Sequence, residues 1–126
     1  PWPTKQGIVI GKFGEQEHPY LKGIKVRNDG IYIATVKNAE VRTIFKGIVT
    51  KIFAVPGSNY SVLIKHGSYY TLYHNLKEVK VYIGKNVNIK EVIGVVSTEP
   101  DKNESILYFQ IWKETERNDP ELWLAK

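Results

Sequence analysis

The clearest strand pattern in this chain of 126 residues is the run Ile106-Leu107-Tyr108-Phe109-Gln110-Ile111-Trp112-Lys113. Side chains of a β-strand point alternately to its two faces. One face therefore carries Leu107, Phe109 and Ile111, three apolar residues suited to a core. The opposite face is richer in aromatic and amide groups and carries Ile106, Tyr108, Gln110 and Trp112. The run predicts a strand with one buried face and one face available for contacts.

Short strand-like runs separated by turn signals recur along the rest of the chain. They cover residues 8–10, 41–55 with a bulge or bend at Gly47, 60–64, 69–76, 79–83 and 87–96. Turns or loops are expected at residues 56–59, 66–68, 84–86 and 99–104, with a short terminal turn over 120–125. No segment sustains a helical period. The sequence predicts an all-β fold, a compact antiparallel β-sheet or sandwich, in a single domain over residues 1–126.

Composition narrows the class of protein without fixing its function. A hydrophobic content of 42% is enough for one domain with a real core. The chain has no Cys, which excludes disulfides and thiolate metal sites. A net charge of +5 favours anionic surroundings, such as an acidic partner, nucleic acid or an anionic cell wall. The Lys residues are scattered, so a solvated surface with an excess of Lys fits equally well.

Three stretches fall in the order of the metal-site motifs of one enzyme family. They read Asn28-Asp29-Gly30-Ile31-Tyr32, Tyr73-His74-Asn75-Leu76 and Ile106-Leu107-Tyr108. From residue 8 to residue 111 the chain resembles the LytM (lysostaphin-type) metallopeptidase domain, whose active members carry His-x-Gly-x-Asp, Tyr-x-His-Leu and His-x-His there. The resemblance implies a fold of the LytM peptidase type, a duplicated hybrid motif. It also implies that the zinc-ligand and catalytic positions are held here by Asn28, Tyr32, Asn75, Ile106 and Tyr108.

Those five residues are unsuited to a catalytic zinc site. Such a site needs about three ligands from His, Asp, Glu or Cys and one position open to water. The three His residues, at positions 18, 66 and 74, fall on none of the ligand positions. Alternation along the strand places Tyr73 and Asn75 on one face and His74 on the other, away from the family's catalytic position. We therefore expect a metallopeptidase-like pseudoenzyme with no catalytic residue, metal or cofactor.

The C-terminal run narrows the resemblance further. It is followed by Asn118-Asp119-Pro120-Glu121-Leu122-Trp123-Leu124. This resembles the end of EnvC-type murein hydrolase activators, degenerate LytM domains with Leu-Tyr-Phe-Glu-Ile in place of His-x-His and a later Asn-Pro-x-x-Trp-Leu. The chain departs from that pattern in the inserted Asp119, in Gln110 for Glu, and in Trp112 where the activators carry a basic residue.

The activator resemblance implies a non-catalytic regulator. In that family the domain binds and activates a zinc-dependent N-acetylmuramoyl-L-alanine amidase during peptidoglycan remodelling and cell separation, and the degenerate groove contacts the amidase. Mapped here, the groove comprises Asn28, Tyr32, Asn75, Ile106, Tyr108 and Trp112. Other interpretations stay open: Tyr32 and Tyr108 as core side chains, and Asn28 as a turn residue before Gly30.

The same resemblance implies a location and a wider protein. We expect a periplasmic or cell-envelope domain, the C-terminal part of a longer exported protein whose upstream coiled coil binds a membrane divisome complex. The first alternative is a peptidoglycan-binding module without an activator role. A hydrolase with a non-standard metal is a second, and a nucleic-acid-binding β-barrel a third. The family motifs argue against the third, so no nucleic-acid partner is expected.

Overall fold

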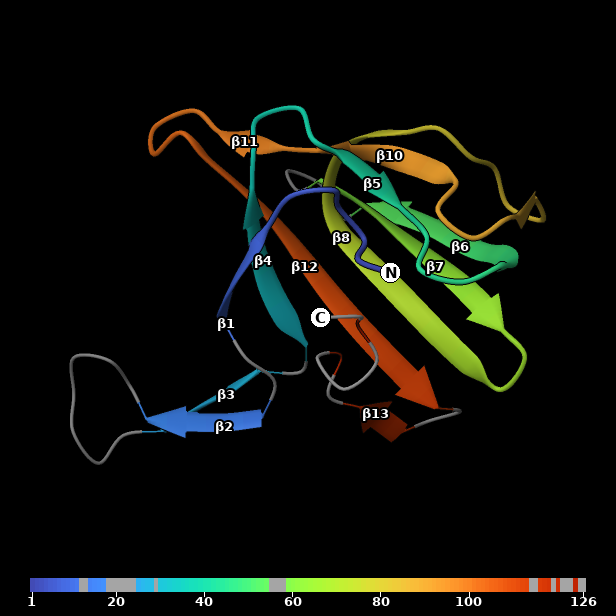
Figure 1. Cartoon of the computed structure of the whole chain (residues 1–126), viewed down its shortest axis with the longest axis horizontal. Coiled ribbons are helices and arrows are strands. Elements are labelled where there is room, and N and C mark those ends of the chain that lie inside the picture. Colours follow the sequence, from blue (N-terminus) through green and yellow to red (C-terminus); the bar gives the residue numbers. More distant parts are fainter. Residues whose placement is uncertain are drawn as a thin grey trace.

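The structure is a computed structural model that describes residues 1–11, 14–17, 25–28, 30–54, 59–113, 116–118, 120 and 124. Within these residues the regular structure is almost entirely antiparallel β-sheet (Figure 1). The all-β prediction is confirmed. No helix among the described residues has the length and apolar character that crossing a membrane requires.

One sheet of eleven strands dominates the molecule. Its main path runs through β1 (Ile8–Gly11), β4 (Ile31–Thr35), β12 (Glu104–Lys113), β8 (Tyr69–Val79), β7 (Tyr60–His66), β6 (Gly47–Ala54) and β9 (Asn86–Val87). Off this path, β5 (Glu40–Arg42) pairs with β10 (Val92–Val96), and β10 also pairs with β8. The short strands β11 (Thr98–Glu99) and β13 (Glu116–Asn118) pair with β12. A separate two-stranded sheet consists of β2 (Gly14–Glu17) and β3 (Lys25–Asn28).

The core lies on the inner face of the large sheet, beneath β5 and β10. Leu107, Phe109 and Ile111 of β12 are buried there, as their alternation predicts. Val41 of β5 and Ile93 and Val96 of β10, two strands seen side by side in Figure 1, belong to the same core. Trp2 packs against the same cluster, and its carbonyl accepts a hydrogen bond of 2.9 Å from Arg42 Nε.

The expected strand over residues 41–55 is divided into β5 and β6. Between them the chain turns, because the backbone N–H of Ile44 donates to the hydroxyl of Tyr73, at 3.1 Å. Gly47 opens β6 because the strands approach closely there: an added Cβ would lie 2.4 Å from the carbonyl oxygen of Lys65. The bulge of β6 falls at Thr50 rather than at Gly47.

The other turns and strands predicted from the sequence agree with the structure only in part. The hairpin tip after His66 is confirmed, with Gly67 at φ 66°. The expected strand over residues 79–83 is wrong, because β8 itself runs to Val79 and the chain then turns. The turn expected over residues 56–59 and the terminal turn over 120–125 lie mostly outside the described residues.

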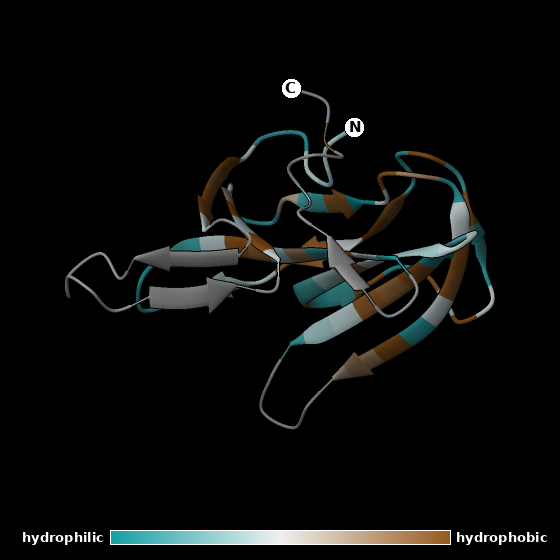
Figure 2. Ribbon diagram, turned by 90° about the horizontal axis from the view of Figure 1, so that it is seen from below, coloured by the Kyte–Doolittle hydropathy of each residue, from teal (hydrophilic) through white to brown (hydrophobic). Residues whose placement is uncertain are grey.

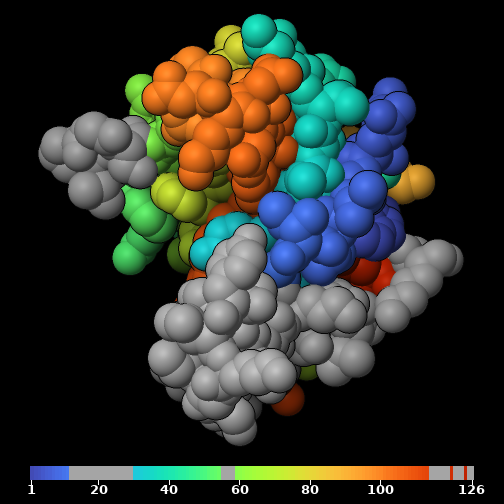
Figure 3. Space-filling model, turned by 90° about the vertical axis from the view of Figure 1, so that its left-hand side faces the viewer, coloured from blue at the N-terminus to red at the C-terminus, as the bar shows by residue number. Residues whose placement is uncertain are grey.

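The outer face of the large sheet, which is the face opposite the core, is bent at its β6–β7 edge. The bulge at Thr50 bends β6, and in Figure 2 the ends of β6 and β7 turn away from the plane of the other strands, to the side opposite the N-terminus. In the space-filling view the green surface of these strands lies beside the orange surface, on the opposite side from the blue N-terminal strand (Figure 3). The outer face is therefore bordered on one side by the β6–β7 hairpin.

Candidate functional site

Four neighbouring strands place four side chains in a row across the outer face. Ser61 of β7 pairs with His74 of β8, His74 with Tyr108 of β12, and Tyr108 with Tyr32 of β4. Residues directly opposite each other in antiparallel strands point to the same face. We call these four residues the outer row. Gly11 of β1 ends the row beside Tyr32, where an added Cβ would lie 2.5 Å from the Tyr32 ring.

Contacts along the outer row are close. Ser61 Oγ and His74 Nδ1 share a hydrogen bond of 2.5 Å. The ring centroids of Tyr32 and Tyr108 lie 4.7 Å apart at an interplanar angle of 42°. Tyr32 is 37% exposed and Tyr108 is half-buried, so neither ring is a core side chain. The structure thus brings together two of the residues predicted from sequence.

His74 lies on the outer face, and the expectation that it points away from that face is wrong. Regular alternation through Tyr70 and Leu72 already places His74 on the outer face, opposite Tyr108. A bulge follows at Asn75, which has a φ of 85° and is skipped in the pairing of β8 with β7. Strict alternation therefore fails across this residue. Tyr73 and Leu76 are both fully buried, although alternation places them on opposite faces. Burial lowers the pKa of His74, which favours the neutral form of its ring.

Asn75 uses its amide to hold the bulge in place. Its Nδ2 donates to the carbonyl of Ile106 at 2.6 Å, and its Oδ1 accepts from Asn59 Nδ2 at 2.7 Å. Its own carbonyl accepts from the backbone N–H of Ser97 at 2.9 Å. Asn75 thereby ties β8 to β12 and to the segment that enters β7. Ile106 is half-buried beside this junction, at the same level as Ala34 of β4.

Beside the outer row the face is hollowed into a groove of about 610 Å³. We call it the aromatic groove. Its lining comes from β6, β7, β8 and β12 and comprises Thr50, Lys51, Phe53, Leu63, Lys65, Tyr70, Leu72, Gln110 and Trp112. Two cross-strand rows form its floor, because Leu72 pairs with both Leu63 and Gln110, and Tyr70 pairs with both Lys65 and Trp112.

A chain of hydrogen bonds joins the groove to the outer row. Trp112 Nε1 donates to Gln110 Oε1 at 2.8 Å, and Gln110 Nε2 donates to the hydroxyl of Tyr108 at 2.9 Å. These bonds satisfy the polar atoms of three successive outward-facing residues of β12. They also fix the orientation of the Trp112 ring, which is half-buried in the groove wall.

One residue of the predicted groove is placed elsewhere in the topology. Asn28 ends β3 and pairs with Gly14 of β2 in the separate small sheet, and its side chain lies outside the described residues. Sequence reasoning missed His74 and Ser61, and it missed every contribution of β6 and β7 to the aromatic groove. The alternation of Leu63 and Lys65 with buried neighbours was a signal for outward-facing side chains, although nothing local indicates that the hairpin bends.

The fold and this outer face define a metallopeptidase-type domain, and comparison with known proteins gives the family. Residues 26–120 match the sequence model of Peptidase family M23, and the chain belongs to this family. It is 27% identical over 126 residues to the murein hydrolase activator EnvC of Escherichia coli (strain K12), covering 99% of this chain and 29% of that protein. The chain therefore spans less than a third of the length of this relative.

Two solved structures share the fold. A chain of the SpoIIQ–SpoIIIAH pore forming complex superimposes with a TM-score of 0.81 at 23% identity, covering 98% of this chain and 89% of that chain. A zinc containing peptidase from Vibrio cholerae superimposes with a TM-score of 0.78 at 23% identity, covering 99% of this chain and 39% of that chain. The prediction of a LytM-type fold is confirmed.

The described residues at the family's metal positions do not fit a zinc ion. The Tyr32 and Tyr108 rings pack against each other, and both side-chain polar atoms of Asn75 are engaged in hydrogen bonds. Ile106 has no ligand atom in its side chain. In the part of the chain that the structure describes, no three His, Cys, Asp or Glu side chains gather closely enough to hold a metal. The chain is a degenerate member of its family, and we derive no metal-dependent step for it.

Proposed function

We propose that this domain is a non-catalytic regulator that binds and activates a cell-wall N-acetylmuramoyl-L-alanine amidase during peptidoglycan remodelling and cell separation. One observation carries the proposal. Tyr32 and Tyr108, which the motif order matches to a peptidase's metal positions, belong to an aromatic and amide surface that continues into a groove. The similarity to a murein hydrolase activator supports the same assignment.

The outer face has the composition of a protein-binding surface. Tyr and Trp dominate binding hot spots because each buries a large area with few rotatable bonds. Here the Trp112 and Tyr108 side chains are already tied together through Gln110. A side chain that is ordered before binding loses less entropy when the partner docks. The surface is thus prepared for contact without a catalytic group.

Activation would work through a shift of populations in the amidase. A regulatory segment of the amidase that docks on this face no longer blocks the amidase's own active site. Moving an enzyme from 1:99 to 99:1 in favour of the open state takes a differential affinity of about 5.5 kcal/mol. Two or three hot spots, each worth about 2 kcal/mol or more, supply that difference. The activity belongs in the cell envelope, where such an amidase meets peptidoglycan.

The test combines the domain with purified amidases from the same organism and follows dye release from labelled peptidoglycan. Release above the level of the amidase alone, and none from the domain alone, is the expected result. Release by the domain alone that a chelator abolishes would overturn the proposal in favour of a cryptic metal site. Absence of release with every amidase, together with co-pelleting of the domain with purified wall material, would favour a peptidoglycan-binding module instead.

A further inference from the structure

The aromatic groove carries two lysines, and its described lining has no negative charge to offset them. Lys51 of β6 and Lys65 of β7 both line it and are both exposed. None of its described lining residues is Asp or Glu. Lys65 Nζ lies 6.0 Å from the centre of the Tyr70 ring, so its charge is held over the aromatic floor.

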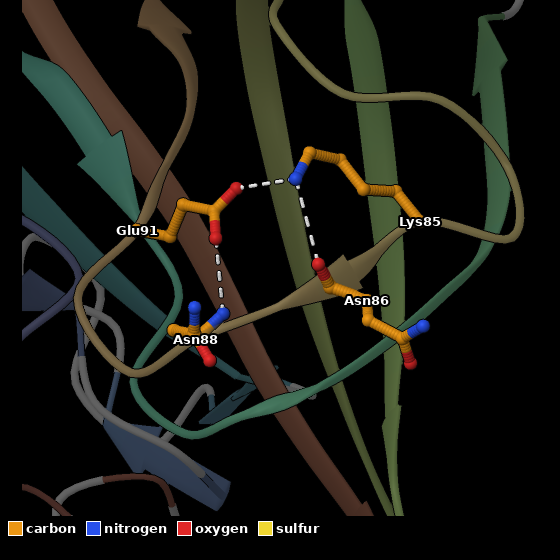
Figure 4. Close-up of polar contacts among 4 residues, drawn as sticks. All are labelled: Lys85, Asn86, Asn88 and Glu91. Atoms are coloured by element: carbon orange, nitrogen blue, oxygen red, sulfur yellow. Dashed lines mark hydrogen bonds and ion pairs between the residues drawn. The ribbon is translucent and has the colours of Figure 1, made fainter.

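Elsewhere in the described structure, lysines near Glu side chains form ion pairs. Lys85 Nζ lies 2.8 Å from a carboxylate oxygen of Glu91, whose other oxygen accepts from the backbone N–H of Asn88 (Figure 4). Lys80 lies 3.9 Å from Glu40. The described residues provide no such carboxylate for Lys51 or Lys65. The groove therefore offers two cations that a ligand can neutralise.

The positive surface extends beyond the groove. A second hollow of about 570 Å³ adjoins it through Lys65 and contains Lys46. The described lining of this hollow also lacks Asp and Glu. Charges arranged in this way attract an acidic ligand during approach and fix its register once it is bound.

Between the lysines the groove is apolar. Phe53 is 46% exposed, and Leu63, Leu72 and the ring of Trp112 complete the surface. Apolar surface left open to water next to lysines that no described carboxylate pairs fits a ligand that alternates apolar and acidic groups. A purely anionic wall polymer would satisfy the lysines while leaving these apolar side chains wet.

We propose that the aromatic groove receives an acidic, amphipathic segment of the partner protein, with apolar side chains on Phe53, Leu63 and Leu72 and carboxylates at Lys51 and Lys65. The proposal rests on the proposed function, since it names the kind of segment through which the amidase docks. It goes beyond the predicted groove, because these five residues lie on β6, β7 and β8 rather than at the family's metal positions.

The first test uses synthetic peptides as probes. Fluorescence anisotropy is measured with a short labelled peptide that alternates Leu and Glu, with the same peptide carrying Lys for Glu, and with one carrying Ser for Leu. The Leu–Glu peptide is expected to bind, more weakly as salt is added, because salt screens exposed charges. The other two are expected to bind at least roughly tenfold more weakly. Equal binding of the Leu–Glu and Leu–Lys peptides would overturn the proposal.

Charge reversal sharpens the test. The double variant Lys51→Glu/Lys65→Glu is expected to lose the Leu–Glu peptide and to gain the Leu–Lys peptide. The control Lys37→Glu/Lys102→Glu makes the same change in net charge at two exposed turn residues that line neither hollow. It is expected to bind as the wild type does. An equal loss in both variants would show that net charge alone attracts the peptide.

Amidase activation by the same variants separates the two proposals. If the wild type activates an amidase and the Lys51→Glu/Lys65→Glu variant activates it equally, the proposal of an acidic segment is wrong and the proposed function stands. If the wild type prefers the Leu–Glu peptide yet activates no amidase, the groove's preference stands and the amidase is the wrong partner.

Discussion

The two faces of β12 have different roles in the molecule. The inner face holds Leu107, Phe109 and Ile111 in the core, at no more than 2% exposure. The outer face holds Tyr108, Gln110 and Trp112, linked by hydrogen bonds and open to a groove. The inner-face residues maintain the fold, while the outer-face residues can be replaced without disturbing the core. A degenerate member of the family can therefore keep the family fold while its outer face differs.

The largest effect is expected from truncation on the inner face. Phe109→Ala removes a fully buried ring that stacks on Tyr73 at a centroid distance of 5.2 Å. The free energy of unfolding should fall by about 3–5 kcal/mol, measured by urea denaturation. Phe109→Leu keeps most of the volume and should lose less. A loss as large from Trp112→Ala would break the distinction between the faces.

Truncation on the outer face should instead remove binding. Trp112→Ala and Tyr32→Ala are each expected to weaken amidase binding by about 2–4 kcal/mol while the unfolding midpoint changes little. Titration calorimetry and dye release measure the two consequences. Tyr82→Ala is the matched control, since Tyr82 is exposed but lines neither hollow. Unchanged activation in both outer-face variants would move the contact surface elsewhere.

A smaller effect on stability is expected from substitutions at Asn75, in the bulge of β8. Asn75→Ala loses two side-chain hydrogen bonds and keeps a Cβ at a φ of 85°, a conformation that Ala adopts less readily than Asn, so it should cost about 1–3 kcal/mol. Asn75→Gly loses the same bonds without the conformational strain. Urea denaturation should therefore rank wild type above Asn75→Gly and Asn75→Gly above Asn75→Ala. Equal stability of the two variants would show that the left-handed backbone carries no strain.

The smallest effect concerns pH and the hairpin beside the groove. Burial lowers the pKa of His66, whose Nδ1 donates to the carbonyl of Lys46 and whose Nε2 accepts from Thr71. A lowered pKa means that the unfolded chain binds more protons than the folded chain. The contribution of His66 to the free energy of unfolding is therefore fully present at pH values above its unfolded pKa of about 6.5. It declines as the pH falls below that pKa.

A variant isolates this contribution from those of the carboxylates and of His74. Urea unfolding of wild type and His66→Gln is compared at about pH 7.5 and at about pH 5.5. The wild type should lose more stability across that interval than the variant does. An identical loss would mean that His66 titrates as it does in the unfolded chain.

Local pattern was enough to predict part of this structure. Alternation in residues 106–113 gave both faces of β12, and the motif order placed Tyr32 and Tyr108 at one site, where their rings now lie in contact. It failed where geometry depends on distant pairing. The bulge at Asn75, after which Leu76 returns to the core, is held by Asn59 and Ile106, which are far from Asn75 in sequence. The bend of β6 and β7 that forms the groove has the same non-local origin.

The most direct test of the central claim locates the partner on the surface. Backbone amide signals of the isotope-labelled domain are followed by NMR while an amidase that the domain activates is titrated in. The account predicts that shifts concentrate on the outer row and on the groove residues of β6, β7, β8 and β12. Shifts concentrated on β5 and β10, on the opposite side of the core, would contradict it.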